Sequence, residues 1–188
     1  SLYISAVRLS QFFHYPVKKH FPKAENERSN PPGPDFSADF PGKFIFIDKK
    51  KEKTCIMETY NQNDMHEVGL DMVFVQDNQS MSHKGVLRGL HFQKDPYCQA
   101  KVVSCTHGAV LDVVVDMRKD SPTYGEYTAV ELTPENGRML YVPRGYAHGF
   151  LALTDNATFN YMVDNEYAPR TEGGVLWNDP AINIPWDE

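Results

Sequence analysis

Arg88 and His91 are the first two residues whose types and spacing suggest chemistry. They lie three positions apart in the stretch Arg-Gly-Leu-His-Phe-Gln. An imidazole titrates near ~6.5 when unperturbed, so it can act as a base at neutral pH. On an extended strand their side chains start on opposite faces, but a glycine in mid-strand commonly opens a bulge. Gly89 therefore indicates a bulge that changes where these two side chains point.

Two later segments carry further reactive groups. A tight turn, Pro143-Arg144-Gly145, leads through Tyr146 and Ala147 to His148 and delivers it into the next strand. The second segment, Phe159-Asn160-Tyr161, places a phenol on a strand, and Tyr167 and Trp177 follow it. Taken alone, each of these residues also has an ordinary structural explanation. His148 could be a hydrogen-bonded histidine of the core, Tyr161 a half-buried tyrosine of a barrel, and Tyr167 and Trp177 aromatic residues that pack against other side chains.

The elements that must position these groups are short strands. Runs rich in Val, Ile, Phe, Tyr and Thr alternate with turn residues, which predicts an all-β sandwich or barrel. The expected strands are 43–47, 55–60, 72–76, 86–93, 101–106, 109–117, 127–132, 139–142, 150–153, 158–163 and 174–176. One short helix is expected over 61–68. In the strand 109–117 one face carries Asp112, Val114 and Asp116, and a partly polar inner face suits a barrel with a ligand cavity.

The segment 1–42 differs from the rest of the chain. It is punctuated by prolines from Pro16 to Pro41. Proline removes hydrogen-bond donors and fixes φ, so regular structure is not expected there. We therefore expect residues 1–42 to form an extended arm or linker and residues 43–188 to form a single domain.

The bulk composition is that of an ordinary globular protein. Hydrophobic residues make up 41% of the chain and charged residues 23%. The formal net charge is −6, which argues against nucleic acid as a partner, because such surfaces cluster Lys and Arg. No run approaches the roughly 18 apolar residues of a membrane helix. Cys55, Cys98 and Cys105 form no Cys-x-x-Cys pair and suggest free thiols in a reducing compartment, so we expect a cytoplasmic protein without a membrane partner.

Several long motifs in order resemble the dTDP-4-dehydrorhamnose 3,5-epimerase family. The similarity covers roughly residues 57–186 and is carried by Phe-Val-Gln-Asp-Asn at 74–78, the run 86–93, the segment 116–125, the run 142–153 and Gly-Val-Leu-Trp-Asn-Asp-Pro at 174–180. The resemblance implies a cupin-type jelly roll, a homodimer, and a dTDP-sugar substrate bound inside the barrel. The implied reaction inverts C3 and C5 of a 4-keto-6-deoxyhexose through an enolate and requires no cofactor.

The resemblance also implies a role for individual residues. His91 corresponds to the base, Tyr161 to the acid on the other face of the sugar, and Lys101 to the cation beside the C4 oxygen. Arg88 corresponds to the residue that binds the diphosphate, for which a guanidinium is well suited. Asp112 is a further expected carboxylate on the inner wall. The expected lining of the nucleotide and sugar pocket is Gln76, Asn78, Glu58, Lys53, His148, Tyr167 and Trp177.

Two positions depart from the family pattern. Lys53 takes the place of an arginine that helps hold the diphosphate, and a lysine keeps the charge but loses the bidentate fork. The family's Asp that pairs with the base histidine follows the Trp-Asn-Asp motif in a Ser-x-Lys-Asp segment, which the sequence does not reach by Glu188. Either Asp112 or a group from the N-terminal arm then orients His91, or the chain is a truncated or degraded version with low activity.

Three alternatives to the 3,5-epimerase remain at this stage. The first keeps the substrate class but performs 3-epimerisation alone or 3,4-ketoisomerisation. The second is an inactive nucleotide-sugar-binding homologue. The third is a metal-dependent cupin, since Pro143-x-Gly145-x-x-His148 resembles the second cupin motif. The first cupin motif needs a His-x-His pair, however, and His91 is flanked by Leu90 and Phe92, so no metal is expected.

Overall fold

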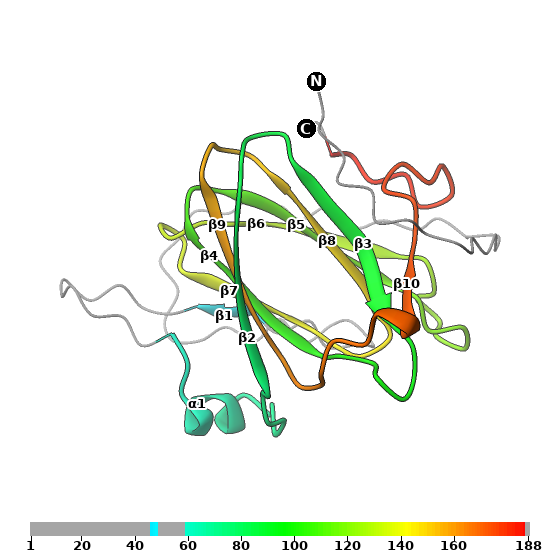
Figure 1. Cartoon of the computed structure of the whole chain (residues 1–188), viewed down its shortest axis with the longest axis horizontal. Coiled ribbons are helices and arrows are strands. Elements are labelled where there is room, and N and C mark those ends of the chain that lie inside the picture. The colour runs from blue at the N-terminus through cyan, green and yellow to red at the C-terminus, as the bar shows by residue number, and fades with distance from the viewer. Residues whose placement is uncertain (1–45, 49–58, 187–188) are drawn as a thin grey trace.

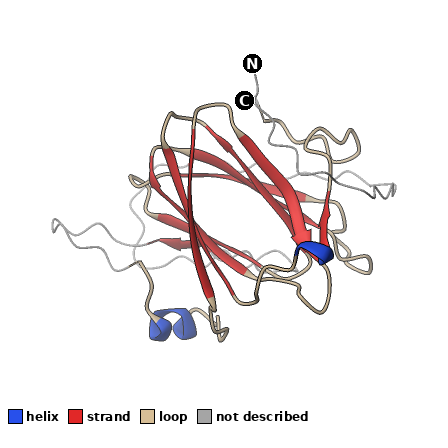
Figure 2. Ribbon diagram, in the orientation of Figure 1, coloured by secondary structure: helices blue, strands red, loops and turns tan. Residues whose placement is uncertain are grey.

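The computed structural model describes residues 46–48 and 59–186 of the chain. It contains ten strands, one short α-helix and one 3-10 helix in these ranges (Figures 1 and 2). The strands are β1 Phe46–Asp48, β2 Gln76–Ser82, β3 Leu87–Gln93, β4 Lys101–His107, β5 Val110–Asp116, β6 Tyr127–Leu132, β7 Arg138–Val142, β8 Tyr146–Ala152, β9 Ala157–Val163 and β10 Glu172–Gly174. The helices are α1 Gln62–Glu67 and η1 Pro169–Thr171.

The strands form two five-stranded antiparallel sheets that face each other (Figure 1). One sheet has the order β1-β7-β4-β9-β2, and the other has the order β10-β3-β8-β5-β6. Neighbours in each sheet are mostly distant in sequence, as a jelly roll requires. The predicted all-β jelly roll of the cupin type is confirmed.

The space between the sheets is filled by alternate side chains of the strands. Val110 and Val114 of β5 pack there with Phe150 of β8 and Phe159 of β9. Asp112 lies between the two valines on the same face of β5 and is fully buried. The predicted partly polar inner face of this strand is therefore present, and it places a carboxylate inside the barrel.

The outer faces of the two sheets are covered by different segments. Met65 of α1 packs with Val102 and Met139 over the β4–β7 part of one sheet. Ile182 and Trp186 pack over the outer face of the other sheet, against the apolar side chains of β3, β5 and β8. The central strands of each sheet are thus buried on both faces, which fixes the register of the strands that carry the polar interior residues.

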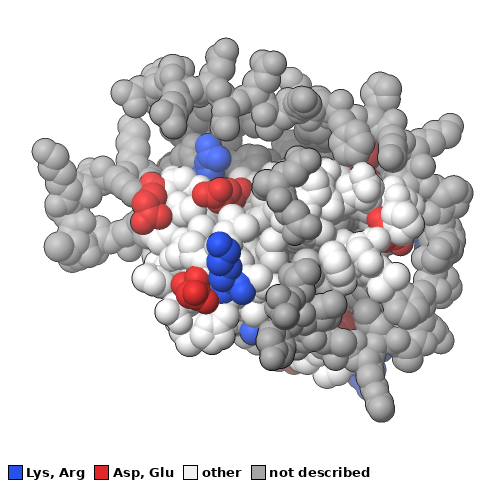
Figure 3. All heavy atoms as spheres, turned by 90° about the horizontal axis from the view of Figure 1, so that it is seen from above, with Lys and Arg blue, Asp and Glu red and all other residues white. Residues whose placement is uncertain are grey.

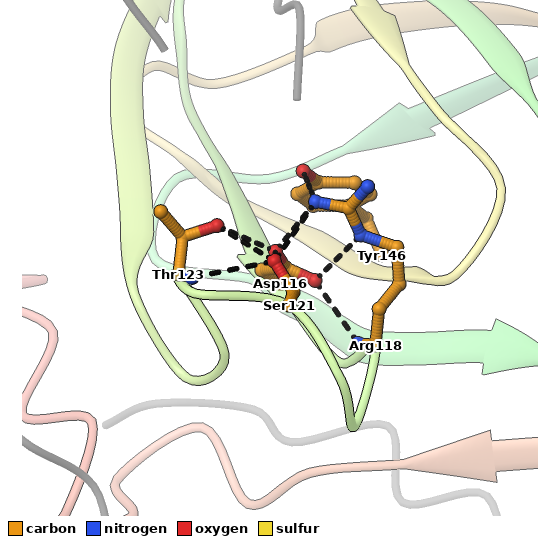
Figure 4. Close-up of polar contacts among 5 residues, drawn as sticks. All are labelled: Asp116, Arg118, Ser121, Thr123 and Tyr146. Carbon is orange, nitrogen blue, oxygen red and sulfur yellow. Dashed lines mark hydrogen bonds and ion pairs between the residues drawn. The ribbon is translucent and has the colours of Figure 1, made fainter. Parts of the chain in front are cut away.

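A hydrogen-bonded network ties the loop between β5 and β6 to the first residue of β8 (Figure 4). Asp116, at the end of β5, accepts hydrogen bonds from Arg118 Nε at 2.9 Å and from the hydroxyl groups of Ser121 and Thr123. Arg118 also lies over the Tyr146 ring, 4.6 Å from its centroid, and donates to the Tyr146 hydroxyl at 2.5 Å. Because Tyr146 begins β8, this network anchors the strand that carries His148 two residues later.

Most predicted elements are confirmed, but three strands were misplaced. The strand expected over 150–153 is part of β8, which begins at Tyr146, and the strand expected over 174–176 shares only Gly174 with β10. The helix expected over 61–68 is α1, and Asn61 is its N-cap, accepting a hydrogen bond from the Asn63 amide. The strand expected over 72–76 was wrong, because β2 begins only at Gln76. The apolar residues Val73 and Val75 are exposed. The strand itself reads Gln-Asp-Asn-Gln-Ser-Met-Ser, a polar sequence without the alternation that signals a half-buried strand.

Some expectations lie outside the described residues. These are the arm over residues 1–42, the residues Lys53, Cys55 and Glu58, and positions 55–58 of the strand expected over 55–60. No helix in the described part of the chain is long and apolar enough to span a membrane. On the face of the molecule shown in Figure 3, the basic and acidic side chains of the described residues are interspersed, and neither sign forms a continuous patch.

Candidate active site

A cavity of about 190 Å³ lies between the two sheets. It is lined mainly by strands β2, β3, β4, β8 and β9, with one residue from β10. The lining residues are Ser80, Arg88, Gly89, His91, Lys101, His148, Gly149, Phe150, Phe159, Tyr161 and Glu172. Among the residues predicted for the site, those that line this cavity are Arg88, His91, Lys101, His148 and Tyr161.

The predicted bulge in β3 brings Arg88 and His91 to the same side. Arg88 pairs with Phe150 and His91 with His148, so two residues of β3 lie opposite the single residue Gly149 of β8. The extra residue reverses the alternation of side chains. Both Arg88 and His91 line the cavity as a result.

The reactive groups reach the cavity from opposite walls. His91 and Arg88 belong to the sheet that contains β3, β8 and β10, whereas Lys101 and Tyr161 belong to the sheet that contains β4 and β9. A ligand between the sheets therefore has an imidazole on one side and a phenol on the other. This is the arrangement that proton removal from one face and proton delivery to the opposite face require.

His91 is neutral over the whole physiological range. Burial of the imidazole, together with the positive charge of Lys101 and the neighbouring His148, lowers the pKa of His91 to about 3. This pKa lies far below the value near ~6.5 of an unperturbed imidazole. Among the described residues, no carboxylate is hydrogen-bonded to His91, and the imidazole is free to accept a proton.

Lys101 is a buried cation at the start of β4. It is 6% exposed. Burial lowers the pKa of Lys101 to about 8, and the negative charges of Asp112 and Glu172 limit this drop. The ammonium group is thus charged at neutral pH and is held in a low-dielectric site, where its field is strong.

Asp112 is bound to His148, and the hypothesis that it orients His91 was wrong. The distance from His148 Nε2 to Asp112 Oδ1 is 2.7 Å, and both side chains are buried. An ionised carboxylate only accepts hydrogen bonds, so Nε2 carries the hydrogen and Nδ1 is the second nitrogen of the ring. Asp112 Oδ2 has no hydrogen-bond partner among the described residues. Asp112 therefore fixes the orientation of His148 instead of that of His91.

Arg88 is held in place by a residue of β2, the edge strand of the opposite sheet. Its Nε donates to Ser82 Oγ at 3.1 Å, and Ser82 is itself buried. Within the described part of the chain the two terminal nitrogens of the guanidinium remain for a ligand in the cavity. The rings of Phe150 and Phe159, which also line the cavity, are stacked with centroids 4.3 Å apart and form an apolar floor.

Four further predicted residues lie outside the cavity lining, in addition to Asp112. Gln76 and Asn78 lie on β2, where the Gln76 amide donates to Asn78 Oδ1 at 2.7 Å. Tyr167 is 56% exposed, and its hydroxyl group lies 3.3 Å from Glu172 Oε2, at the edge of the cavity. Trp177 packs against the apolar cluster on the outer face of the other sheet, and its carbonyl accepts a hydrogen bond from the Trp186 indole. Trp177 thus packs on the outer face of the sheet that contains β3, β5 and β8, and its expected place in the nucleotide pocket stays a prediction.

Glu172 and Ser80 line the cavity but were not predicted. Glu172 begins β10, a strand of three residues whose Gly174 pairs with His91. The sequence of β10, Glu-Gly-Gly, lacks the residue pattern that predicts a strand. Only the pairing of β10 with β3 shows that Glu172 lies at the cavity. Ser80 Oγ is buried without a hydrogen-bond partner among the described residues. Within the described ranges, no group of three or more His, Cys, Asp or Glu side chains is placed to hold a metal ion.

A jelly-roll barrel whose interior brings together an imidazole, an ammonium group and a phenol has the architecture of a cupin-type isomerase. The family model for dTDP-4-dehydrorhamnose 3,5-epimerase matches residues 41–188, and the chain belongs to this family. The resemblance noted in the sequence is confirmed.

Individual relatives agree with this assignment. The chain is 52% identical over 136 residues to the dTDP-4-dehydrorhamnose 3,5-epimerase of Shigella flexneri, a match that covers 72% of this chain and 75% of that protein. The crystal structure of the same enzyme from Elizabethkingia anophelis has a TM-score of 0.74 at 44% identity, over 80% of this chain and 85% of that one. A Legionella pneumophila epimerase solved with dTDP-4-keto-L-rhamnose has a TM-score of 0.72 at 40% identity, over 77% of this chain and 78% of that one.

Proposed function

We propose that this chain is a dTDP-4-dehydrorhamnose 3,5-epimerase that converts dTDP-4-dehydro-6-deoxyglucose to dTDP-4-dehydrorhamnose. The observation that carries the proposal is the placement of His91 and Tyr161 on opposite walls of one cavity, with Lys101 beside them. The family membership supports the substrate class. The product belongs to L-rhamnose and polysaccharide biosynthesis.

In the proposed mechanism, His91 removes the proton from C5 or C3 of the hexose. The electron pair of the broken C–H bond moves into the C4 carbonyl and gives an enolate, with the proton on the imidazole. Tyr161 then delivers its hydroxyl proton to the same carbon from the opposite face, which inverts the centre, and solvent restores both groups. The neutral state of His91 supports the role of base, because its imidazole nitrogen is unprotonated at every physiological pH.

Lys101 supplies the positive charge that the enolate needs. A preorganised cation in a water-poor site stabilises developing negative charge far more than the same cation does in water. Arg88 binds the diphosphate through the guanidinium nitrogens that Ser82 leaves unused. His148, held by Asp112, offers its second ring nitrogen to the sugar.

The test is incubation with dTDP-4-keto-6-deoxyglucose in D2O, followed by NMR. We expect deuterium at both C3 and C5 and, with a reductase present, an L-rhamnose product. Deuterium at C3 alone would favour a 3-epimerase, transfer of the ketone from C4 to C3 a 3,4-ketoisomerase, and binding without exchange an inactive homologue. His91→Asn should abolish exchange at both carbons, whereas His83→Asn, at an exposed histidine outside the cavity, should leave exchange unchanged.

Tyr161→Phe separates the acid from the base. His91 still exchanges the proton in this variant, but it returns a deuteron to the face from which it took the proton. Exchange without inversion should therefore become the main outcome. If Tyr161→Phe lowered exchange and inversion by the same factor, its role as the acid would be contradicted.

We further propose that the protein acts as a cytoplasmic homodimer. The free buried thiols of Cys98 and Cys105 fit a reducing compartment. The edge strand β2 and the residues before it expose the apolar side chains of Val73, Val75 and Met81. An exposed apolar edge of this kind favours pairing with a second copy.

The test of the dimer is light scattering. We expect a dimer for the parent protein and a monomer for Val75→Lys combined with Met81→Lys, because two charges on this edge would have to be buried in the interface. Leu176→Lys, at another exposed apolar residue, is the control that should remain dimeric. A double variant that keeps the mass of the parent would contradict this interface.

A further inference from the structure

Strands β3 and β8 approach each other more closely at Gly149 than any side chain would allow. A Cβ atom built on Gly149 would lie 2.5 Å from the Arg88 carbonyl oxygen and 3.0 Å from Gly89 Cα. The approach is mutual, because a Cβ on Gly89 would lie 2.6 Å from Gly149 Cα and 2.6 Å from the His148 carbonyl oxygen. Atoms at such distances overlap, and in both cases the atoms in the way belong to the backbone.

This contact coincides with the bulge that builds the site. The two residues of β3 that lie opposite Gly149 are the ones between Arg88 and His91. Leu90, on the bulge, packs into the outer apolar cluster, while Arg88 and His91 turn inward to the cavity. The bulge thus has room only because position 149 carries no side chain.

We propose that Gly149 is a positioning residue that sets Arg88 and His91 together in the cavity through its contact with the β3 bulge. The inference rests on the proposed function of that cavity. Gly149 is suited to a clean test because, unlike Gly89 with its φ of +114°, it is not among the residues with a positive φ. An alanine at 149 therefore changes the space available to β3 and leaves the local backbone conformation allowed.

The consequence of an added methyl group is a displaced bulge. The Arg88 carbonyl and the Gly89 backbone must move away from β8, and Arg88 and His91 move with them. A displacement of about 1 Å in a catalytic group lowers the rate on the order of 100-fold. A weakened bidentate contact from Arg88 costs on the order of 10-fold in ligand affinity.

The experiment compares Gly149→Ala with the parent protein in two assays. Deuterium exchange at C3 and C5 reports on His91, and the Kd of dTDP measured by calorimetry reports on Arg88. We expect kcat to fall on the order of 100-fold and the Kd of dTDP to rise on the order of 10-fold in the same variant.

Two controls separate positioning from stability. Gly173→Ala, on β10 beside β3, adds the same methyl group against the ends of the Phe92 and Lys94 side chains instead of backbone atoms, and both assays should stay within twofold of the parent. Val115→Ala, in the outer apolar cluster, should lower the melting temperature while the folded protein keeps its kcat and Kd.

Three outcomes would contradict either the positioning role of Gly149 or the proposed function. A folded Gly149→Ala variant with both values within twofold of the parent would overturn the proposal. Failure of both Gly149→Ala and Gly89→Ala to fold, even with saturating dTDP, would overturn it as well, because the close contact would then serve the fold instead of the site. Absence of exchange in the parent protein would reject the proposed function, while dTDP affinity would still test the positioning of Arg88.

Discussion

The charge on Lys101 makes a quantitative prediction about alkaline pH. Its pKa is lowered to about 8, first by burial, so about half of the cavities contain an ammonium group at that pH. One pH unit higher, about one tenth remain charged. If the ammonium stabilises the enolate, kcat/KM should be level near neutrality and fall tenfold for each unit above about 8, because kcat/KM reports the ionisation of the free enzyme.

Other groups do not produce this decline. Burial raises the pKa of Tyr161 above its usual value near 10, so the phenol keeps its proton throughout the assay. The pKa of His91, at about 3, places its titration far below this range. The ionisation of Lys101 does not itself favour unfolding, since a lysine whose folded pKa lies below its unfolded value contributes stability that increases as pH rises through that interval.

The assay is the initial rate of C5 exchange between pH 6 and 9.5, measured over short times. Lys101→Met keeps the length of the side chain and removes its charge, so kcat should fall by roughly 100-fold to 1,000-fold and lose its alkaline decline. Lys94→Met, on an exposed lysine outside the cavity lining, is the matched control and should keep the parent profile. A parent profile that stays level to pH 9.5, or the same decline in Lys101→Met, would refute the assignment.

Three further predictions follow from contacts around the cavity and in the loop between β5 and β6. Asp112→Asn removes the negative charge that raises the pKa of Lys101, so the alkaline decline should move to lower pH in the same assay, and an unmoved decline would contradict the role of Asp112. Ser82→Ala removes the hydrogen bond to Arg88 Nε and should raise the Kd of dTDP and KM several-fold by calorimetry and kinetics, with kcat nearly unchanged. Burial alone would raise the pKa of Asp116, but hydrogen bonds from Arg118, Ser121 and Thr123 outweigh it and lower this pKa to about 2. The stability that the group contributes is therefore complete above its unfolded pKa of about 4 and is lost as pH falls toward about 2. Asp116→Asn should cost about 3 kcal/mol in urea unfolding at pH 7 and should flatten this acid dependence.

The sequence predicted the features of the site that depend on short-range rules. Gly89 between Arg88 and His91 was enough to predict a bulge, because a glycine in mid-strand has few other uses. The polar inner face of β5 followed from two-residue alternation around Asp112. Both predictions needed only the conformation of one strand.

Pairing between distant strands was not predictable in the same way. Asp112 bonds to His148, 36 positions away, because β5 and β8 are neighbours in a register that places Val114 opposite His148. Glu172 enters the cavity because the three-residue strand β10 pairs with β3. The residue propensities of a single strand do not determine either register, because the register of each strand pair depends on how both sheets pack.

The charges around the cavity explain how His91, the proposed base, can serve the proposed reaction despite its low pKa. In the structure, His91 lies near Lys101 and His148, and no carboxylate among the described residues is bonded to it. Its proton affinity is therefore low. A sugar nucleotide brings the negative charge of a diphosphate to Arg88, on the same strand as His91, and the enolate that forms adds negative charge beside Lys101. Both changes favour a positive charge on the imidazole, because an opposite charge within a few ångströms raises the pKa of a histidine. The base then becomes stronger as the substrate binds and as the proton moves, which is when the reaction needs it.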